Sequence, residues 1–324
     1  MRATSLFLSL IVASIISLYW ALVSGSVSSN FAQVLDALWT HQDTVLSQVL
    51  WELRIPRALS AYVTGALLAL AGVLMQVLLR NPLADPYVLG ISGGAAVAVL
   101  AGMLFGAGVL LLNLGAFLGA LISTLIVFAL SHGKGSWTPT RLLLTGVVVA
   151  AGWGALISFI LAIAPERDLP GMLFWLMGDL SYASMPGLAS LLLFFGLITS
   201  WFFARDLNML IRGELSASAL GVSVLGLRRL LFFLAALLTA SAVTTAGSVG
   251  FVGLIVPHMV RLLMGSDHRI LIPASVLLGG SLLCLADTLA RSLIAPQQLP
   301  VGVITALIGV PVFLFLLNRG GARL

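Results

Sequence analysis

Charged side chains are scarce in this chain: only 8% of its 324 residues are Asp, Glu, Lys or Arg. Apolar residues make up 60% of the sequence, and the mean hydropathy is +1.15. A soluble globule has too little interior to bury so much apolar surface, so the composition excludes an ordinary soluble domain. The chain is predicted to lie in a lipid bilayer.

Cysteine is nearly absent as well. The lone Cys284 excludes a disulfide within the chain and is expected to be a small packing residue. The four histidines, His41, His132, His258 and His268, are scattered and have no cysteine at metal-ligand spacing. We therefore expect no metal site and no other cofactor.

The sequence also lacks motifs of catalysis and nucleotide binding. It has no HExxH motif and no aspartate pair at protease spacing within a span. The single lysine, Lys134, follows a glycine, but Phe128 and Gly135 replace the first glycine and the hydroxyl residue of a phosphate-binding loop. Among ionisable residues deep in the predicted spans, which could relay protons, Asp287 is almost the only candidate, and it lies near a predicted outer end. The chain is thus predicted not to be an enzyme or a proton-coupled transporter, and if it pumps, a partner hydrolyses the ATP.

About ten apolar stretches are long enough to cross the membrane, which takes about 20 mostly apolar residues for a core roughly 30 Å thick. The first also resembles a signal peptide, but its apolar run is longer than usual and we expect it to be retained. The longest connections, about residues 24–58, 164–186 and 205–229, leave no room for a soluble domain. The predicted fold is therefore all-α, a single polytopic membrane domain over residues 1–324. The predicted spans are 5–23, 59–79, 90–110, 113–131, 142–163, 187–204, 230–247, 249–265, 270–289 and 301–318.

The basic residues predict the orientation, since Lys and Arg concentrate in cytoplasmic loops. With the N-terminus inside and ten alternating spans, twelve of the 16 basic residues fall on the cytoplasmic side. Both termini are then cytoplasmic. The outer side receives Arg54, Arg57, Arg167 and Arg291.

Three connections have a composition too specific for simple linkers. Residues 81–95, NPLADPYVLGISGGA, combine a Pro-rich turn with three glycines that permit close helix approach, and a turn with packing glycines is the simpler interpretation. Residues 247–269, which include Pro257, suggest a broken helix near a pathway or a kinked packing helix. Residues 205–229 have apolar residues at helical spacing and four arginines, typical of an amphipathic segment that lies on the membrane or docks to another protein.

Taken in order, these motifs resemble the permease subunits of type II ABC importers for cobalamin, haem and ferric siderophores. The resemblance extends from about residue 50 to residue 318. A single motif such as RIPR is a weak signal, whereas eight in the family's order on a ten-span chain are specific. The motifs are RIPR (54–57), NPLADP (81–86), LGISGGA (89–95), MLIRGELSASALG (209–221), VGFVGLIVPHMVR (249–261), DHR (267–269), LADTLAR (285–291) and LPVGVITALIGVPVF (299–313).

The resemblance implies partners and a location. The partners are a second copy of the chain, two ATP-binding-cassette ATPase subunits on the cytoplasmic side, and a periplasmic or surface substrate-binding protein on the outer side. Membrane lipid surrounds the chain, no nucleic-acid partner is expected, and the location is the bacterial inner (cytoplasmic) membrane. The implied function is ATP-driven import of a metal chelate, whether ferric siderophore, haem or cobalamin. The alternative is a secondary transporter or channel that needs no ATPase.

Roles for individual residues also follow from the resemblance. Asn81, Leu83 and Thr140 are expected near a cytoplasmic gate, where Pro139 replaces a hydroxyl residue that relatives can carry. The small residues of the span from Leu143 are expected to line the path or to pack helices. The region that seats on the ATPase is expected to include Arg212, Gly213, Glu214, Ser216, Ala217, Ala219, Leu220 and Gly221.

Arg54, Arg57 and Arg291 face the outer side against the charge bias, and the resemblance places them where acidic side chains of the binding protein dock. Arginine suits this role because its planar fork can hold a carboxylate with two hydrogen bonds. Arg54 and Arg57 would be neighbours if their segment is helical, although Pro56 suits only a first turn or an extended entry. The alternative is that these arginines extend to lipid headgroups and anchor the second span.

Overall fold

The computed structural model describes residues 2–25, 31–40, 44–132 and 138–320. Every regular element in these ranges is helical, which confirms the predicted all-α fold. The long helices are α1 (Arg2–Val23), α4 (Ile55–Leu78), α5 (Ile91–Leu104), α6 (Val109–Ser131), α7 (Pro139–Ile163), α9 (Gly187–Phe202), α12 (Val224–Ala246), α13 (Val252–Met264), α14 (His268–Ser292) and α15 (Val301–Gly320). The shorter elements are α2 (Phe31–Thr40), α3 (Val45–Gln48), η1 (Val49–Arg54), η2 (Pro86–Leu89), α8 (Leu169–Met177), α10 (Ala204–Ile211) and α11 (Glu214–Ala219).

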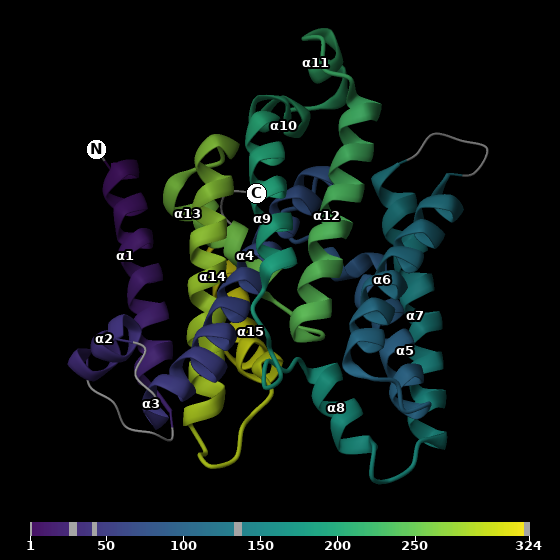
Figure 1. Cartoon of the computed structure of the whole chain (residues 1–324). Helices are drawn as coiled ribbons and strands as arrows, with labels where there is room; N and C mark the ends of the chain where they lie inside the picture. The colour runs from purple at the N-terminus through teal and green to yellow at the C-terminus, as the bar shows by residue number, and fades with distance from the viewer. Residues whose placement is uncertain (1, 26–30, 41–43, 133–137, 321–324) are drawn as a thin grey trace.

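Helix α4 lies at the centre of the bundle and is buried along nearly its whole length (Figure 1). Helices α12, α13 and α14 pack around it. Helix α1 lies against α14 at one edge, and α5, α6 and α7 form the opposite edge. The apolar core therefore follows α4, while α7 at the edge leaves most of its side chains exposed.

Two glycines of α4 bring its backbone into direct contact with neighbouring helices. A Cβ atom on Gly65 would lie 2.1 Å from the carbonyl oxygen of Gly279 in α14. A Cβ atom on Gly72, about two turns later, would lie 2.0 Å from the carbonyl oxygen of Gly253 in α13. Small residues allow such close approach, which holds helices together in a membrane. Helices α4, α13 and α14 thus form one tightly packed unit.

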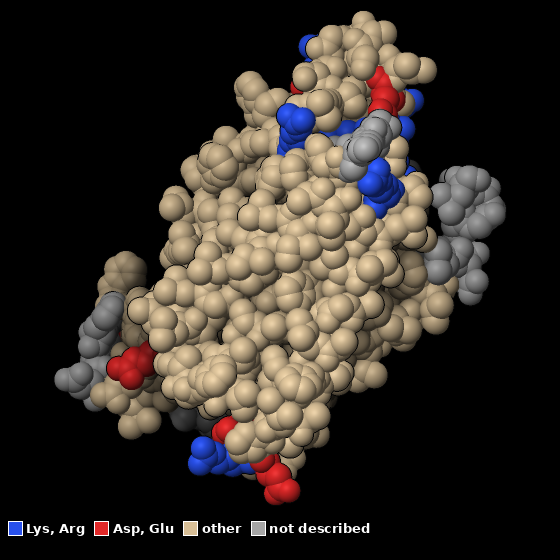
Figure 2. Space-filling model, turned by 90° about the vertical axis from the view of Figure 1, so that its right-hand side faces the viewer, with Lys and Arg blue, Asp and Glu red and all other residues tan. Residues whose placement is uncertain are grey.

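The helices locate the apolar segments as predicted. In the part of the chain that the structure describes, six helices are long and apolar enough to cross a membrane, or up to seven if α9 and α10, bent by 61°, form one span. Helices α5, α13 and α15 are apolar but shorter. Every predicted span falls on one of these helices, whereas the count of ten spans and the single domain remain predictions. On the face shown in Figure 2, charged side chains lie at the two ends and a broad uncharged band separates them.

The helical segment that carries the second predicted span begins well before residue 59. Elements α3, η1 and α4 continue one another, so Val45–Leu78 is a helical run of 34 residues. Pro56 is the second residue of α4 and lies inside this continuous run rather than at its start. The preceding turn η1 is π-helical, a feature that no spacing rule in the sequence predicted.

The predicted amphipathic segment 205–229 consists of α10, α11 and the first turn of α12. Helix α11 projects beyond the rest of the bundle (Figure 1). We call this end of the molecule the α11 end. The opposite end, where α8 and α3 lie, is called the α8 end.

Candidate functional site: a pocket and a projecting helix at the α11 end

A pocket of about 250 Å³ lies at the α11 end, between the turn that follows α4 and the start of α7. The predicted gate residues Asn81, Leu83 and Thr140 all line it, although they come from two distant parts of the sequence. Their role as a gate remains a prediction. The full lining is Leu79, Asn81, Leu83, Ala84, Val88, Pro139, Thr140 and Leu143.

One wall of the pocket is the turn between α4 and η2. The backbone N–H of Asn81 donates to the carbonyl of Gln76 at 3.1 Å, and that of Arg80 donates to the carbonyl of Val77 at 3.2 Å. These two bonds form a Schellman motif, which satisfies carbonyl groups at a helix end. Such a motif needs a left-handed residue, usually glycine, and here Arg80 takes that position with φ 48°.

Two side-chain bonds hold the rest of this turn. Asn81 Oδ1 accepts from the backbone N–H of Leu83 at 2.9 Å. Asp85 Oδ1 accepts from the backbone N–H of Tyr87 at 2.8 Å and so caps the start of η2. Burial raises the pKa of Asp85 to about 6, although the bond from Tyr87 acts in the opposite direction. The polar residues of the NPLADP motif therefore shape the turn.

The opposite wall of the pocket is the start of α7. Thr138 is the N-cap residue, and its hydroxyl oxygen accepts from the backbone N–H of Arg141 at 3.3 Å. Pro139 is the first residue of the helix, where its fixed φ and missing N–H are well tolerated. Residues 133–137, which include Lys134, lie outside the described part of the chain. Pro139 thus initiates α7 at the position where relatives can carry a hydroxyl residue.

Helix α11 contains four of the eight residues predicted for the coupling region, and the other four flank it. Ala217 is its one buried residue, whereas the flanking Leu215 and Leu220 are 89% and 64% exposed. Gly221, just after the helix, has φ +85°, a left-handed conformation that suits glycine. The region therefore offers apolar side chains at the surface, as a docking element would. Arg212, Ser216, Ala219, Leu220 and Gly221 are exposed, and Gly213 and Glu214 are half-buried.

The first residue of α11 forms two ion pairs. Glu214 Oε1 contacts Nη2 of Arg80, in the turn after α4, and Nη2 of Arg228, in α12. Sequence reasoning did not identify these pairs, because Arg80 is 134 residues from Glu214 and no motif spacing connects them. The helical spacing rules could not find the Arg228 pair either, since residues 220–223 separate α11 from α12.

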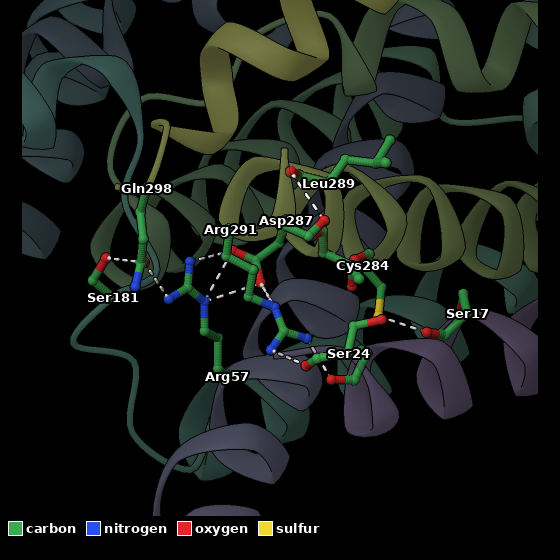
Figure 3. Close-up of polar contacts among 12 residues, drawn as sticks. Ser17, Ser24, Arg57, Ser181, Cys284, Asp287, Leu289, Arg291 and Gln298 are labelled. Carbon is green, nitrogen blue, oxygen red and sulfur yellow. Dashed lines mark hydrogen bonds and ion pairs between the residues drawn. The ribbon is translucent and has the colours of Figure 1, made fainter. Parts of the chain in front are cut away.

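Three of the four outer arginines of the sequence analysis, Arg54, Arg57 and Arg291, lie at the α8 end, and Figure 3 shows Arg57 and Arg291 at Asp287. Arg57 donates to both carboxylate oxygens of Asp287, from Nε at 3.1 and 3.0 Å and from Nη2 at 2.8 Å. Its remaining Nη1 donates to Gln298 Oε1 at 2.8 Å. Arg291 forms a second ion pair with Asp287 at 3.7 Å. Asp287 thus joins the start of α4 to the end of α14.

Two of these arginines also bind the end of α1. Arg54 Nη1 donates to the carbonyls of Leu22 at 2.7 Å and Val23 at 3.3 Å. Arg291 Nη1 donates to the carbonyl of Ser24 at 3.0 Å, and its Nη2 to that of Ala21. The last carbonyls of a helix lack partners within the helix and carry a partial negative charge, so cations there are favourable. Arg54 and Arg291 therefore cap α1.

The low exposure of these arginines corrects the sequence analysis, which assigned them to a docking surface. Arg54 is 4% exposed, and the side chains of Arg57 and Arg291 are 13% and 11% exposed. Nothing in the sequence indicated that the carboxylate of Asp287, four residues before Arg291, also binds Arg57. These arginines neither project freely toward a partner nor extend to lipid headgroups, because partners within the chain bind them. Their contribution to docking remains a prediction.

The profile of the FecCD transport family matches residues 10–319, nearly the whole chain. The chain belongs to the FecCD transport family. This result confirms the resemblance found in the motifs. The FecCD chain described here is thus a multi-pass membrane permease subunit.

Named relatives agree with this assignment. The cobalamin import system permease of Halobacterium salinarum is 42% identical over 274 residues, which cover 84% of this chain and 73% of that protein. The hemin transport system permease of Yersinia pestis is 41% identical over 305 residues, which cover 91% and 90%. A solved structure described as an inward-facing metal-chelate type ABC transporter superposes with a TM-score of 0.88 at 32% identity, covering 98% of this chain and 99% of that one.

Proposed function

We propose that this FecCD chain is the permease subunit of a type II ABC importer that moves a metal chelate into the cytoplasm. The observation that carries the proposal is the nearly full-length match to the family and to a metal-chelate type ABC transporter. ATP is hydrolysed by separate ATPase subunits that seat on α11. Cobalamin and haem are the candidate substrates favoured by the named relatives. A ferric siderophore is the third candidate, from the motif resemblance.

The distribution of charge supports an orientation with the α11 end in the cytoplasm. Arginines of α10, of the start of α12 and of the ends of α4 and α13 all lie at this end. The described part of the α8 end carries fewer arginines than acidic residues. Because cytoplasmic loops are enriched in Lys and Arg, this difference fits a cytoplasmic α11 end and an external α8 end. The described charged residues at the α8 end are four arginines, Arg54, Arg57, Arg167 and Arg291, and six acidic residues, Asp36, Glu52, Glu166, Asp168, Asp179 and Asp287.

The position of α7 supports the proposed pairing of two copies. This helix is at the edge of the bundle, and Leu142, Gly146 and Ile160 are its only buried residues. Gly152 and Gly154 have no neighbouring atoms within 4 Å of an added Cβ. A path lined by α7 needs a second wall, because one copy leaves this face open. A second copy supplies that wall in the proposed homodimer.

The proposed docking of a substrate-binding protein at the α8 end rests on the motif resemblance. Among the arginines there, Arg57 extends its guanidinium group to the surface, where it contacts Gln298. Gln298 is exposed and accepts from Arg57 Nη1. If a partner carboxylate binds there, Gln298→Glu should compete for Nη1 while the pair with Asp287 remains. We expect weaker docking at low salt, measured by surface plasmon resonance against the binding protein. Docking unchanged by Gln298→Glu would remove Arg57 from the interface.

Reconstitution separates the importer from the alternative of a secondary transporter or channel. The chain is placed in proteoliposomes alone, or with its ATPase subunits and binding protein, and offered cobalamin, haem and a ferric hydroxamate chelate in turn. An importer takes up one of these chelates only with ATPase subunits and ATP present. Uptake by the chain alone would overturn the proposal in favour of the alternative.

A variant of α11 tests where the ATPase seats. Ala219→Asp adds a charge to the exposed surface of α11 and is expected to abolish ATPase binding while the chain still folds. Gly221→Arg is less informative, because arginine is strained at the left-handed backbone of Gly221. Ser266→Asp, also exposed at the α11 end but outside α11, is the matched control. Co-purification of the ATPase with Ala219→Asp at the wild-type ratio would show that α11 is not its seat.

A further inference from the structure

We propose that Glu214 is the positioning residue through which α11 acts on the pocket at the α11 end. Its carboxylate joins α11 to one wall of the pocket through Arg80 and to the surroundings of the other wall through Arg228. The inference rests on the proposed function, in which an ATPase moves α11. It adds the route by which that movement reaches Asn81, Leu83 and Thr140.

Helix α11 has few other attachments to the bundle. It projects from the end of the molecule, and Ala217 is the residue it buries (Figure 1). Backbone bonds such as that from Val222 N–H to the Ala217 carbonyl, at 3.0 Å, close the helix on itself. In the described part of the chain, the ion pairs of α11 are the two made by Glu214. They tie the helix to residues beyond its own loop.

The first ion pair reaches the turn that forms one pocket wall. Arg80 immediately precedes Asn81, which lines the pocket. The backbone of Arg80 is left-handed, a conformation that is unfavourable for residues other than glycine, asparagine and aspartate. Glycine would complete the Schellman motif more favourably. An unfavourable residue at such a position suggests that its side chain has a function, and the side chain of Arg80 binds Glu214.

The second ion pair reaches the start of α7. The side chain of Arg228 is 9% exposed and lines a water-sized cavity of about 10 Å³ together with Thr138, Pro139 and Leu142. Pro139 also lines the larger pocket. Arg228 therefore lies beside the opposite wall of the pocket.

One oxygen atom thus connects three elements. Because Arg80 and Arg228 both contact Glu214 Oε1, a displacement of α11 changes both contacts together. Charged hydrogen bonds are directional and stronger than neutral ones, so they transmit the position of the carboxylate to the groups that bind it. The geometry predicts that the pocket widens or narrows with the movement of α11 only while these contacts are intact.

The test follows the width of the pocket within one copy. Spin labels replace Leu83 and Thr140, one on each wall, and their distance is measured by pulsed electron resonance in the complex with its ATPase subunits. The distance is compared between two conditions, nucleotide-free buffer and ATP with vanadate. In the otherwise wild-type chain we expect the label distance to differ between the two conditions. Arg80→Gly suits the backbone of the turn but removes the side chain, and it should reduce this difference to less than half.

A matched control removes a neighbouring arginine without touching the link. Arg229 is next to Arg228 in the sequence, but it is exposed and forms none of the ion pairs described above. The variant Arg229→Met should therefore keep the full distance change. Glu214→Gln removes both charge pairs and should reduce the change at least as much as Arg80→Gly. Adding Arg80→Gly to Glu214→Gln should reduce the change no further, because Arg80 acts only through Glu214. Additive losses would contradict a shared link.

The outcomes separate this inference from the proposed function. A full distance change in Arg80→Gly, with the wild-type chain responding to nucleotide, would overturn the role of Glu214 and leave the importer intact. A wild-type chain that binds no ATPase would overturn the importer itself. Thermal unfolding of Arg80→Gly at or above the wild-type temperature is expected, and it shows that a lost response does not come from misfolding.

Discussion

The Arg57–Asp287 pair at the α8 end predicts a large loss of stability for Asp287→Asn. The side chains of Arg57 and Asp287 are 13% and 2% exposed, so the pair is largely removed from water. Removing one partner of a buried pair leaves the other charge uncompensated and costs about 3–5 kcal/mol. Here the substitution leaves two arginines, Arg57 and Arg291, beside a neutral amide, so we expect a loss in the upper part of that range.

The measurement is thermal and denaturant unfolding of the purified chain in detergent. Asp168→Asn is the matched control, because it makes the same change in an exposed pair at the same end of the molecule. Its partner Arg167 is 85% exposed and lies 3.6 Å away, and exposed pairs contribute only about 0–1 kcal/mol. Asparagine also remains a good residue for the start of α8. If both variants unfolded alike, within about 0.5 kcal/mol of wild type, the structural role assigned to Asp287 would be wrong.

Two further predictions concern packing and pH. Gly72→Ala should destabilise the chain by about 1–3 kcal/mol or more in denaturant unfolding, because the added Cβ would overlap the carbonyl of Gly253. The control Gly154→Ala should be near neutral, because the space around Gly154 is open. Equal stabilities of the two variants would contradict the close backbone contact at Gly72. Asp85 has a pKa raised to about 6, so its neutral form is favoured in the folded chain. Stability should be highest below the ordinary pKa near 4 and fall as the pH rises through about 6. Asp85→Asn should remove this part of the pH dependence in thermal unfolding between pH 4 and 7, and an unchanged profile would assign it to another group.

The positions of the apolar helices could be predicted because hydropathy is a local property. Each span needs only its own residues to be apolar, and the boundaries found for α6, α7 and α14 lie within a few residues of those expected. The turn at residues 81–86 was predictable for the same reason, since Pro, Asn and Asp shape it locally. The early start of the helix before Ile55 was not, because the π-helical turn has no residue pattern of its own.

Contacts between segments that are distant in the sequence could not be predicted from it. Helical spacing relates Asp287 to Arg291, four residues later, but nothing relates either to Arg57, which is 230 residues from Asp287. The sequence thus identified the three arginines as unusual and assigned them to a partner, while the carboxylate that binds two of them lay elsewhere in the chain. The same limit hid Glu214 as the residue that joins Arg80 to Arg228.

The close glycine contacts restrict where the bundle can deform. Helix α4 cannot slide along α13 or α14 without separating backbones that touch at Gly65 and Gly72. Helix α7 is joined to η2 in the same manner, because a Cβ on Gly146 would lie 2.4 Å from the carbonyl oxygen of Val88. Residues 79–85 connect the end of α4 to η2. If the unit of α4, α13 and α14 moves relative to the unit of α7 and η2, the backbone dihedral angles of residues 79–85 must change. Arg80, with its left-handed φ, is part of it.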